Sequence, residues 1–121
     1  MPAASSPLKP VGGTRGCPSR DRPIDLVHLS RQTLGDQALE QEVLGLMDRQ
    51  IVAFTGRLEL ANDDERRHIA HALKGAARNV GAFALANAAE AVEHAPRDAA
   101  ALAGFTTEMA RTAAFIATLR N

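Results

Sequence analysis

The chain is poor in aromatic residues and has no charge bias. Among its 121 residues there is no Trp and no Tyr and only four Phe, so the aromatic platforms on which single-stranded nucleic acids stack are missing. Fourteen Lys and Arg balance fourteen Asp and Glu, and no dense basic run is present. We therefore do not expect nucleic acid as a partner.

Cysteine and long apolar runs are also scarce. The one cysteine, Cys17, cannot form an internal disulfide. No stretch of about 18 apolar residues is available to cross a membrane. The first residues lack the continuous apolar segment of a signal peptide. The sequence thus predicts a cytoplasmic protein that does not bind membranes.

The N-terminus is rich in proline and glycine. Residues 1–22 combine these residues with small polar ones, which predicts a disordered tail. The chain is 45% hydrophobic and 23% charged, which suits one domain with a single core. We place this domain at residues 23–121.

Helical rather than strand periodicity runs through this domain. Apolar residues recur at a spacing close to 3.6, and no hairpin signal appears. The predicted helices span about residues 23–34, 37–60, 62–79, 82–95 and 98–119. Short connections favour antiparallel neighbours. The predicted fold class is therefore all-α: an antiparallel up-down four-helix bundle with a short additional N-terminal helix.

The same periodicity predicts core residues and helix ends. In the first two helices the expected apolar contacts are Ile24, Val27, Leu34, Leu39, Val43, Leu46, Met47, Val52, Phe54 and Leu58. In the last two they are Phe83, Ala86, Val92, Leu102, Phe105, Met109, Ile116 and Leu119. Asn62 or Asp63 and Asp98 are expected N-caps, and Gly81 is expected to turn the chain. His28 and His94 are expected to be solvated.

One polar stripe on the third helix carries the most chemical information. At about 100° per residue, Lys74, Gly75 and Arg78 fall within roughly 60° of His71. The apolar residues of this helix fall on the opposite side: Ile69, Leu73, Ala76 and Val80. His71 is therefore predicted to point away from the core.

These residue types suit phosphoryl transfer. Histidine titrates near pH 6.5, so at neutral pH it is largely an unprotonated nucleophile that can form a phosphoramidate. Lys74 offers a point charge and three donors to phosphoryl oxygens, and Arg78 is a more distant cation. Gly75 costs about 1 kcal/mol within a helix, and its missing side chain lets a partner approach His71 closely.

Residues 71–82 read HALKGAARNVGA, and Leu85 and Glu90 follow this run. This pattern resembles the histidine-containing phosphotransfer (HPt) domain. The resemblance covers roughly residues 24–119. It implies that His71 is the phosphoacceptor, that Lys74 assists transfer and that Gly75 clears the docking site of a receiver domain. Some family members place a glutamine 22 residues after the histidine, where it contacts the imidazole.

This chain has Glu93 at that position, and a carboxylate there would orient the ring but also repel the phosphorylated form. Arg78, Arg67 and His68 are the further expected docking residues. No Gly-rich phosphate loop or nucleotide lid is present, so we expect no autonomous ATP-dependent kinase activity.

The predicted protein is thus a monomeric phosphorelay intermediate of two-component signal transduction. It takes phosphate from a receiver aspartate and passes it to another. Its expected partners are response-regulator receiver domains and a hybrid sensor histidine kinase. It needs no cofactor of its own, because Mg²⁺ is expected on the receiver.

The sequence leaves three alternatives open. The dimerisation and phosphoacceptor domain of a sensor kinase also presents a histidine on a helical bundle. A docking protein that has lost transfer activity would keep the same face. A metal-binding bundle is suggested by carboxylate and imidazole spacings that include Glu65, His68, His71, Glu90, Glu93 and His94. However, His68 shares the outward face of His71, whereas di-iron ligands point into a bundle.

Overall fold

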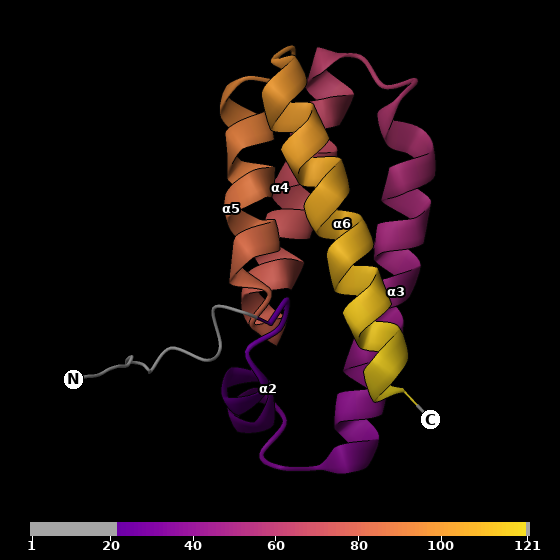
Figure 1. Cartoon of the computed structure of the whole chain (residues 1–121), viewed down its shortest axis with the longest axis vertical. Helices are drawn as coiled ribbons and strands as arrows, with labels where there is room; N and C mark the ends of the chain where they lie inside the picture. Colours follow the sequence, from indigo (N-terminus) through magenta and orange to yellow (C-terminus); the bar gives the residue numbers. More distant parts are fainter. Residues whose placement is uncertain (1–21, 121) are drawn as a thin grey trace, which may run out of the picture.

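The computed structural model describes residues 22–120, which form five helices and no strand (Figure 1). The helices are α2 (Leu26–Gln32), α3 (Gln37–Leu58), α4 (Asp63–Val80), α5 (Phe83–His94) and α6 (Ala99–Leu119). The predicted all-helical class is confirmed. The predicted tail of residues 1–22, with Cys17, lies outside the described residues except for Arg22.

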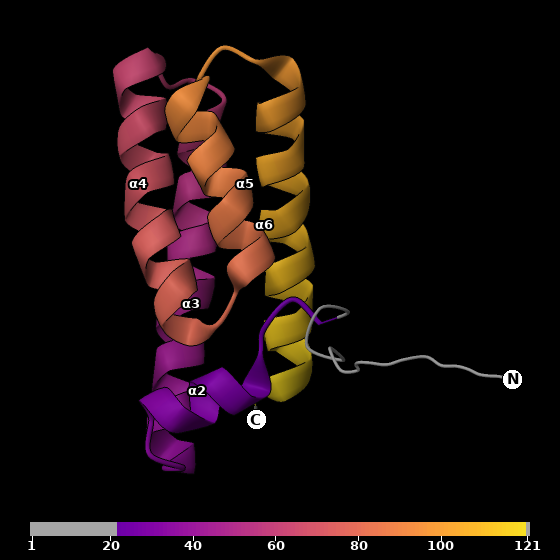
Figure 2. The same cartoon turned by 90° about the vertical axis from the view of Figure 1, so that its left-hand side faces the viewer.

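The four longer helices lie side by side along the long axis of the molecule. α4 packs against α3 and α5, and α6 packs against the same two helices. The α3–α4 and α5–α6 connections lie at the top of Figure 1, and the α4–α5 connection lies toward the other end. The short α2 packs against α4 and lies across the lower end of the molecule (Figure 2).

Side-chain caps fix where the helices begin. At α4 the Glu65 amide donates to Asn62 Oδ1 at 2.9 Å, and the Asn62 amide donates to Glu65 Oε1 at 3.0 Å. This reciprocal pair satisfies two of the backbone groups that a helix start leaves free. Asp98 caps α6 by accepting from the Ala101 amide. The predicted caps Asn62 and Asp98 are confirmed.

Gly81 ends α4 and ties it to α2. Its φ of +90° lies in the left-handed region that favours glycine. A Cβ here would lie 2.9 Å from the Asp25 carbonyl oxygen. The Asp25 amide also donates to the Gly81 carbonyl at 2.9 Å. The turn predicted at Gly81 is therefore confirmed, and it holds the register of the site-bearing helix.

Small residues form much of the α4–α5 contact. Buried alanines occur on both helices and on the turn between them: Ala70, Ala77, Ala82, Ala86 and Ala89. Because alanine has a single methyl group, α4 and α5 approach closely. Polar side chains at the rim of this contact are thus brought within reach of one another.

Several predicted core contacts are wrong. Six of the expected residues are exposed: Val27, Leu34, Leu39, Leu46, Val52 and Phe83. The core is filled instead by residues that include Leu29, Leu44, Ile51 and Leu85. α3 packs mainly against α4 and α6, so its buried stripe follows Leu44, Met47 and Ile51, and the stripe through Leu39 and Leu46 faces outward.

His28 also differs from the expectation of a solvated side chain. It is half-buried, and its ring meets Phe83 edge-on with ring centroids 5.2 Å apart. His94 is exposed, as predicted. The helix that carries His28 is shorter than expected, because Asp25 caps it at Leu26 and it ends at Gln32.

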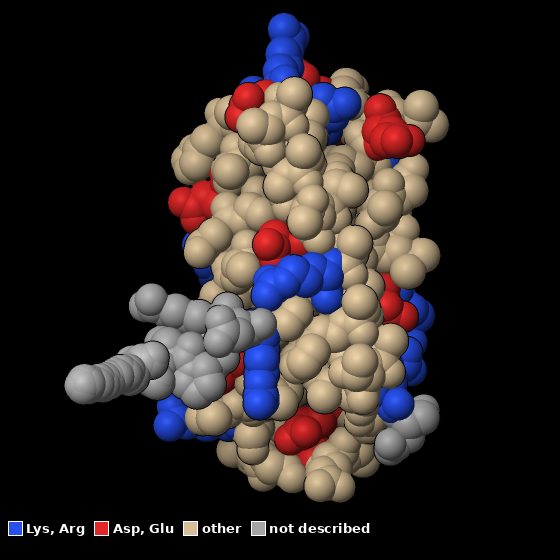
Figure 3. Space-filling model, viewed as in Figure 1, with Lys and Arg blue, Asp and Glu red and all other residues tan. Residues whose placement is uncertain are grey.

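The surface mixes both signs of charge. On the face shown in Figure 3, basic and acidic side chains are interspersed among uncharged residues and form no large patch of one sign. Within residues 22–120 no helix combines the length and the apolar character that a membrane span requires.

Candidate functional site

The position of His71 follows from the register of α4. Ile69, Leu73 and Val80 are buried, which turns the opposite side of the helix to solvent. The His71 side chain lies on that side and is 72% exposed. The outward orientation predicted from the 100° step is confirmed, and the imidazole is open to a partner.

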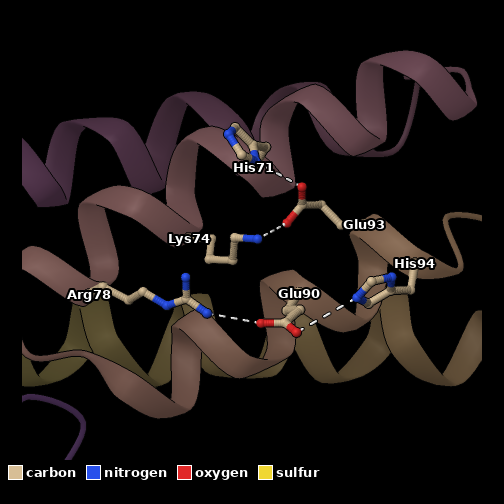
Figure 4. A network of polar contacts seen from close by, with 6 residues as sticks. All are labelled: His71, Lys74, Arg78, Glu90, Glu93 and His94. Carbon is tan, nitrogen blue, oxygen red and sulfur yellow. Dashed lines mark hydrogen bonds and ion pairs between the residues drawn. The ribbon is translucent and has the colours of Figure 1, made fainter.

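Glu93 of α5 holds the imidazole from one side. Its Oε2 lies 2.8 Å from His71 Nδ1. Figure 4 shows the two side chains pointing toward each other. A carboxylate only accepts hydrogen bonds, so Nδ1 carries the proton and donates. In the neutral ring the other nitrogen, Nε2, then keeps its lone pair. The predicted contact between Glu93 and the ring is therefore present, and it leaves the lone pair of Nε2 unengaged by Glu93.

Lys74 binds the other oxygen of the same carboxylate. Its Nζ lies 2.5 Å from Glu93 Oε1, and the two side chains are 17% and 21% exposed (Figure 4). The hydrogen bond from Lys74 lowers the pKa of Glu93; desolvation opposes this, and the contact with His71 lowers the pKa further. Glu93 is thus ionised at neutral pH, and Lys74 rests on the carboxylate one turn from His71.

Gly75 lies beside His71 in open space. It is exposed, and no described atom lies within 4 Å of the position that a Cβ would occupy. Packing of another part of the described chain therefore does not require a glycine here. Its effect is to leave the backbone bare next to His71.

The other predicted docking residues occupy the edges of this surface. Arg78 pairs with Glu90 Oε1 at 2.9 Å, and Arg67 pairs with Asp64 Oδ1 at 3.1 Å. Both arginine side chains are about half exposed, which keeps their ion pairs weak and exchangeable. His68 is exposed on the same side of α4.

Glu90 was not predicted to partner Arg78. It lies three residues before Glu93 on α5, so both carboxylates face α4, and its Oε2 lies 3.7 Å from His94 Nε2 (Figure 4). The i,i+3 spacing of Glu90 and Glu93 could have revealed this from sequence, because such residues share a helix face.

The ligands of the metal-binding alternative do not gather. Across residues 22–120, no group of three or more His, Cys, Asp or Glu side chains is placed to hold a metal ion. Glu65 is engaged in the N-terminal cap of α4, and Glu93 binds Lys74 and His71.

Comparison with known proteins gives one match. The family model of the Hpt domain matches residues 32–121, which include α3 to α6 and the whole site. Neither the curated proteins nor the solved structures provide a significant match.

Proposed function

Because the chain belongs to the Hpt domain family, whose members carry out histidine phosphotransfer in phosphorelays, we propose that it is a phosphorelay intermediate with His71 as phosphoacceptor. A phospho-aspartate of one receiver domain would supply the phosphoryl group, and an aspartate of another receiver would take it. The observation that carries this proposal is the exposed His71 ring, fixed through Nδ1 by Glu93.

The transfer step follows from the protonation state of the ring. The Nε2 lone pair attacks phosphorus, a P–N bond forms, and the bond between phosphorus and the aspartate oxygen breaks. The leaving carboxylate takes the bonding electron pair. Nδ1 keeps its proton, so the product ring is cationic, and the Glu93 carboxylate compensates this charge. No proton has to leave during the attack.

Lys74 and Glu93 have opposing effects on the phosphorylated form. The phosphoryl oxygens carry nearly two negative charges, which attract the Lys74 ammonium away from Glu93. Glu93 then loses its cation and repels the phosphoryl group. Glu93 therefore leaves the phosphorylated product less stable than Lys74 alone would make it, which suits a protein that passes phosphate on.

The receiver supplies what this chain lacks. Its acidic pocket and Mg²⁺ would sit over His71, and the bare backbone at Gly75 would admit them. Arg78, Arg67 and His68 would contact the rim of the receiver. Such receivers belong to response regulators or to a hybrid sensor histidine kinase, and no ATP-dependent activity of the chain itself is required.

We also propose the finer features of the fold and setting. Residues 23–121 form the domain, with α3 to α6 as an antiparallel up-down four-helix bundle and α2 as the additional helix. The alternating ends of the connections in Figure 1 support this order. The protein acts in the cytoplasm, without nucleic acid, membrane or cofactor of its own.

The test uses a phosphorylated receiver as donor. Wild-type protein should acquire acid-labile, base-stable phosphate, His71→Gln should acquire none, and Lys74→Ala should be labelled more slowly. His94→Gln is the matched control, because His94 is equally exposed on the neighbouring part of α5. Labelling of His71→Gln at the wild-type rate would disprove the assignment.

A further inference from the structure

The outer side of α3 carries an apolar surface that no other part of the described chain covers. Leu39 and Leu46 are 40% and 54% exposed. With the half-buried Val43 they line a shallow groove, and Glu42 and Arg49 complete its walls. We call these five residues the α3 face. Exposed apolar residues rimmed by polar ones are typical of interaction sites.

The two charges of the α3 face have no partner among the residues that the structure describes. Neither Glu42 nor Arg49 makes a hydrogen bond or ion pair within residues 22–120, and both side chains are exposed. They differ in this from Arg67, Arg78 and Arg97, which all pair with carboxylates. The α3 face thus offers one free carboxylate and one free guanidinium.

The arrangement is nearly symmetric about Leu46. At about 100° per residue, Leu39 and the exposed Ala53 lie roughly 20° to either side of Leu46. At about 1.5 Å per residue, they lie roughly 10 Å before and after it. Glu42 and Arg49 lie on one flank, about 6 Å before and 4.5 Å after Leu46. A twofold rotation that reverses the helix direction at Leu46 therefore brings the position of Glu42 close to that of Arg49, and the position of Arg49 close to that of Glu42.

We propose that the α3 face binds a second copy of this chain, with the two α3 helices antiparallel about a twofold axis through Leu46. Leu46 then meets Leu46 of the partner subunit. Leu39 packs over Ala53 of the partner subunit, whose small side chain allows close approach. Glu42 reaches Arg49 of the partner subunit, and the symmetry repeats this ion pair.

Self-association explains both charges together. A partner of one charge sign would pair with Glu42 or with Arg49 and would leave the other facing like charge. A second copy in this register pairs both. The inference departs from the monomer expected from sequence. Since a single helix pair buries a small area, the dimer should be weak and concentration-dependent.

The dimer leaves the phosphoacceptor accessible. α3 packs against α4 and α6, whereas the ring of His71 is held by Glu93 from α5. The α3 face therefore shares no residue with the site around His71. The dimer would present two phosphoacceptors, and the inference stands or falls independently of the phosphotransfer proposal.

Analytical ultracentrifugation of the full chain tests the association. Over roughly 1 μM to 1 mM, the weight-average mass should rise from the 12.8 kDa of one chain toward twice that value. Leu46→Glu should keep the mass of one chain throughout, with an unchanged circular dichroism spectrum because Leu46 is outside the core. A wild-type mass of one chain up to 1 mM would overturn the inference.

Charge reversal tests the register. Glu42→Arg and Arg49→Glu should each weaken self-association at least about tenfold, because like charges then face each other twice. An equimolar mixture of these two variants should associate at least as well as wild type, since both cross-pairs have opposite signs again. Glu59→Arg, an exposed reversal beyond the α3 face, is the matched control and should change nothing. A mixture no tighter than its separate components would refute the proposed register.

A receiver docked on the α3 face is the competing outcome. We expect Leu46→Glu to accept phosphate from a receiver at the wild-type rate. If Leu46→Glu loses phosphate transfer while self-association is unchanged, the face belongs to the receiver and the second copy is ruled out.

Discussion

Gly75 offers a substitution that should separate stability from function. It lies within α4, is exposed, and has open space where a side chain would begin. In Gly75→Gln the new side chain should therefore fit without strain. Replacing glycine by a good helix former within a helix stabilises by about 0.5–1 kcal/mol. In a domain of this size that raises the melting temperature by roughly 2–8 °C.

Phosphotransfer should change in the opposite direction. A glutamine at position 75 would stand beside His71, where the receiver has to bring its phospho-aspartate to Nε2. A displacement of about 1 Å at a reacting centre can cost roughly a hundredfold in rate, so we expect a loss of at least about tenfold. The assay is the initial rate of label transfer from a phosphorylated receiver, measured beside thermal unfolding by circular dichroism.

Gly104→Gln is the control for this experiment. Gly104 is also exposed, lies within α6, and has no described atom within 4 Å of its would-be Cβ. The control should gain the same stability and keep the wild-type transfer rate. The reasoning fails if Gly75→Gln transfers as fast as Gly104→Gln, or if it melts below wild type.

Further predictions concern Glu93 and Gly81. Glu93→Gln should slow phosphorylation of His71, because a neutral amide compensates the cationic ring less well. It should also lengthen the lifetime of the phosphohistidine, because the carboxylate that repels the phosphoryl group is gone. The lifetime is measured by the decay of label after the receiver is removed. Because the contacts with Lys74 and His71 hold the pKa of Glu93 below its ordinary value, ionised Glu93 contributes stability that is present above that ordinary value and is lost as pH falls through the folded-state pKa. The difference in urea unfolding free energy between wild type and Glu93→Gln should therefore shrink as pH falls from 6 to about 3, and a difference that grows would contradict this account. Gly81→Ala should lower the unfolding free energy by at least about 1 kcal/mol. The φ of +90° disfavours a side chain, and the Asp25 carbonyl oxygen would lie 2.9 Å from the new Cβ. An unchanged urea midpoint would contradict this prediction.

The orientation of His71 was predictable because it depends on a single helix. Helix geometry fixes the angle between His71 and the buried side chains of α4 whatever the neighbours are. Caps are equally local, so Asn62, Asp98 and Gly81 could be assigned from residue type and position. These features need no knowledge of the tertiary arrangement.

The core side of α3 was not predictable in the same way. This helix has apolar residues on more than one side, and periodicity alone does not say which stripe faces α4 and α6. Leu44 and Ile51 are buried, whereas Leu46 and Val52 are exposed. The choice depends on packing between helices, which a single sequence does not reveal.

The ion pairs of the site depend on tertiary structure as well. Lys74 was expected to lie near the imidazole and await a phosphoryl group, and the structure places it on the carboxylate of Glu93. Glu90 and Arg78 are 12 residues apart, and the close approach of α4 and α5 brings them together. Their pairing requires the helix packing that buried alanines allow.

The central claim is that His71 Nε2 is the atom that takes the phosphoryl group. Nuclear magnetic resonance of the 15N-labelled chain after phosphorylation by a receiver, with detection of 31P–15N coupling, tests this most directly. The account predicts one phosphorus signal coupled to Nε2 of His71, with Nδ1 still protonated. Coupling to Nδ1, or to a nitrogen of His68 or His94, would contradict it.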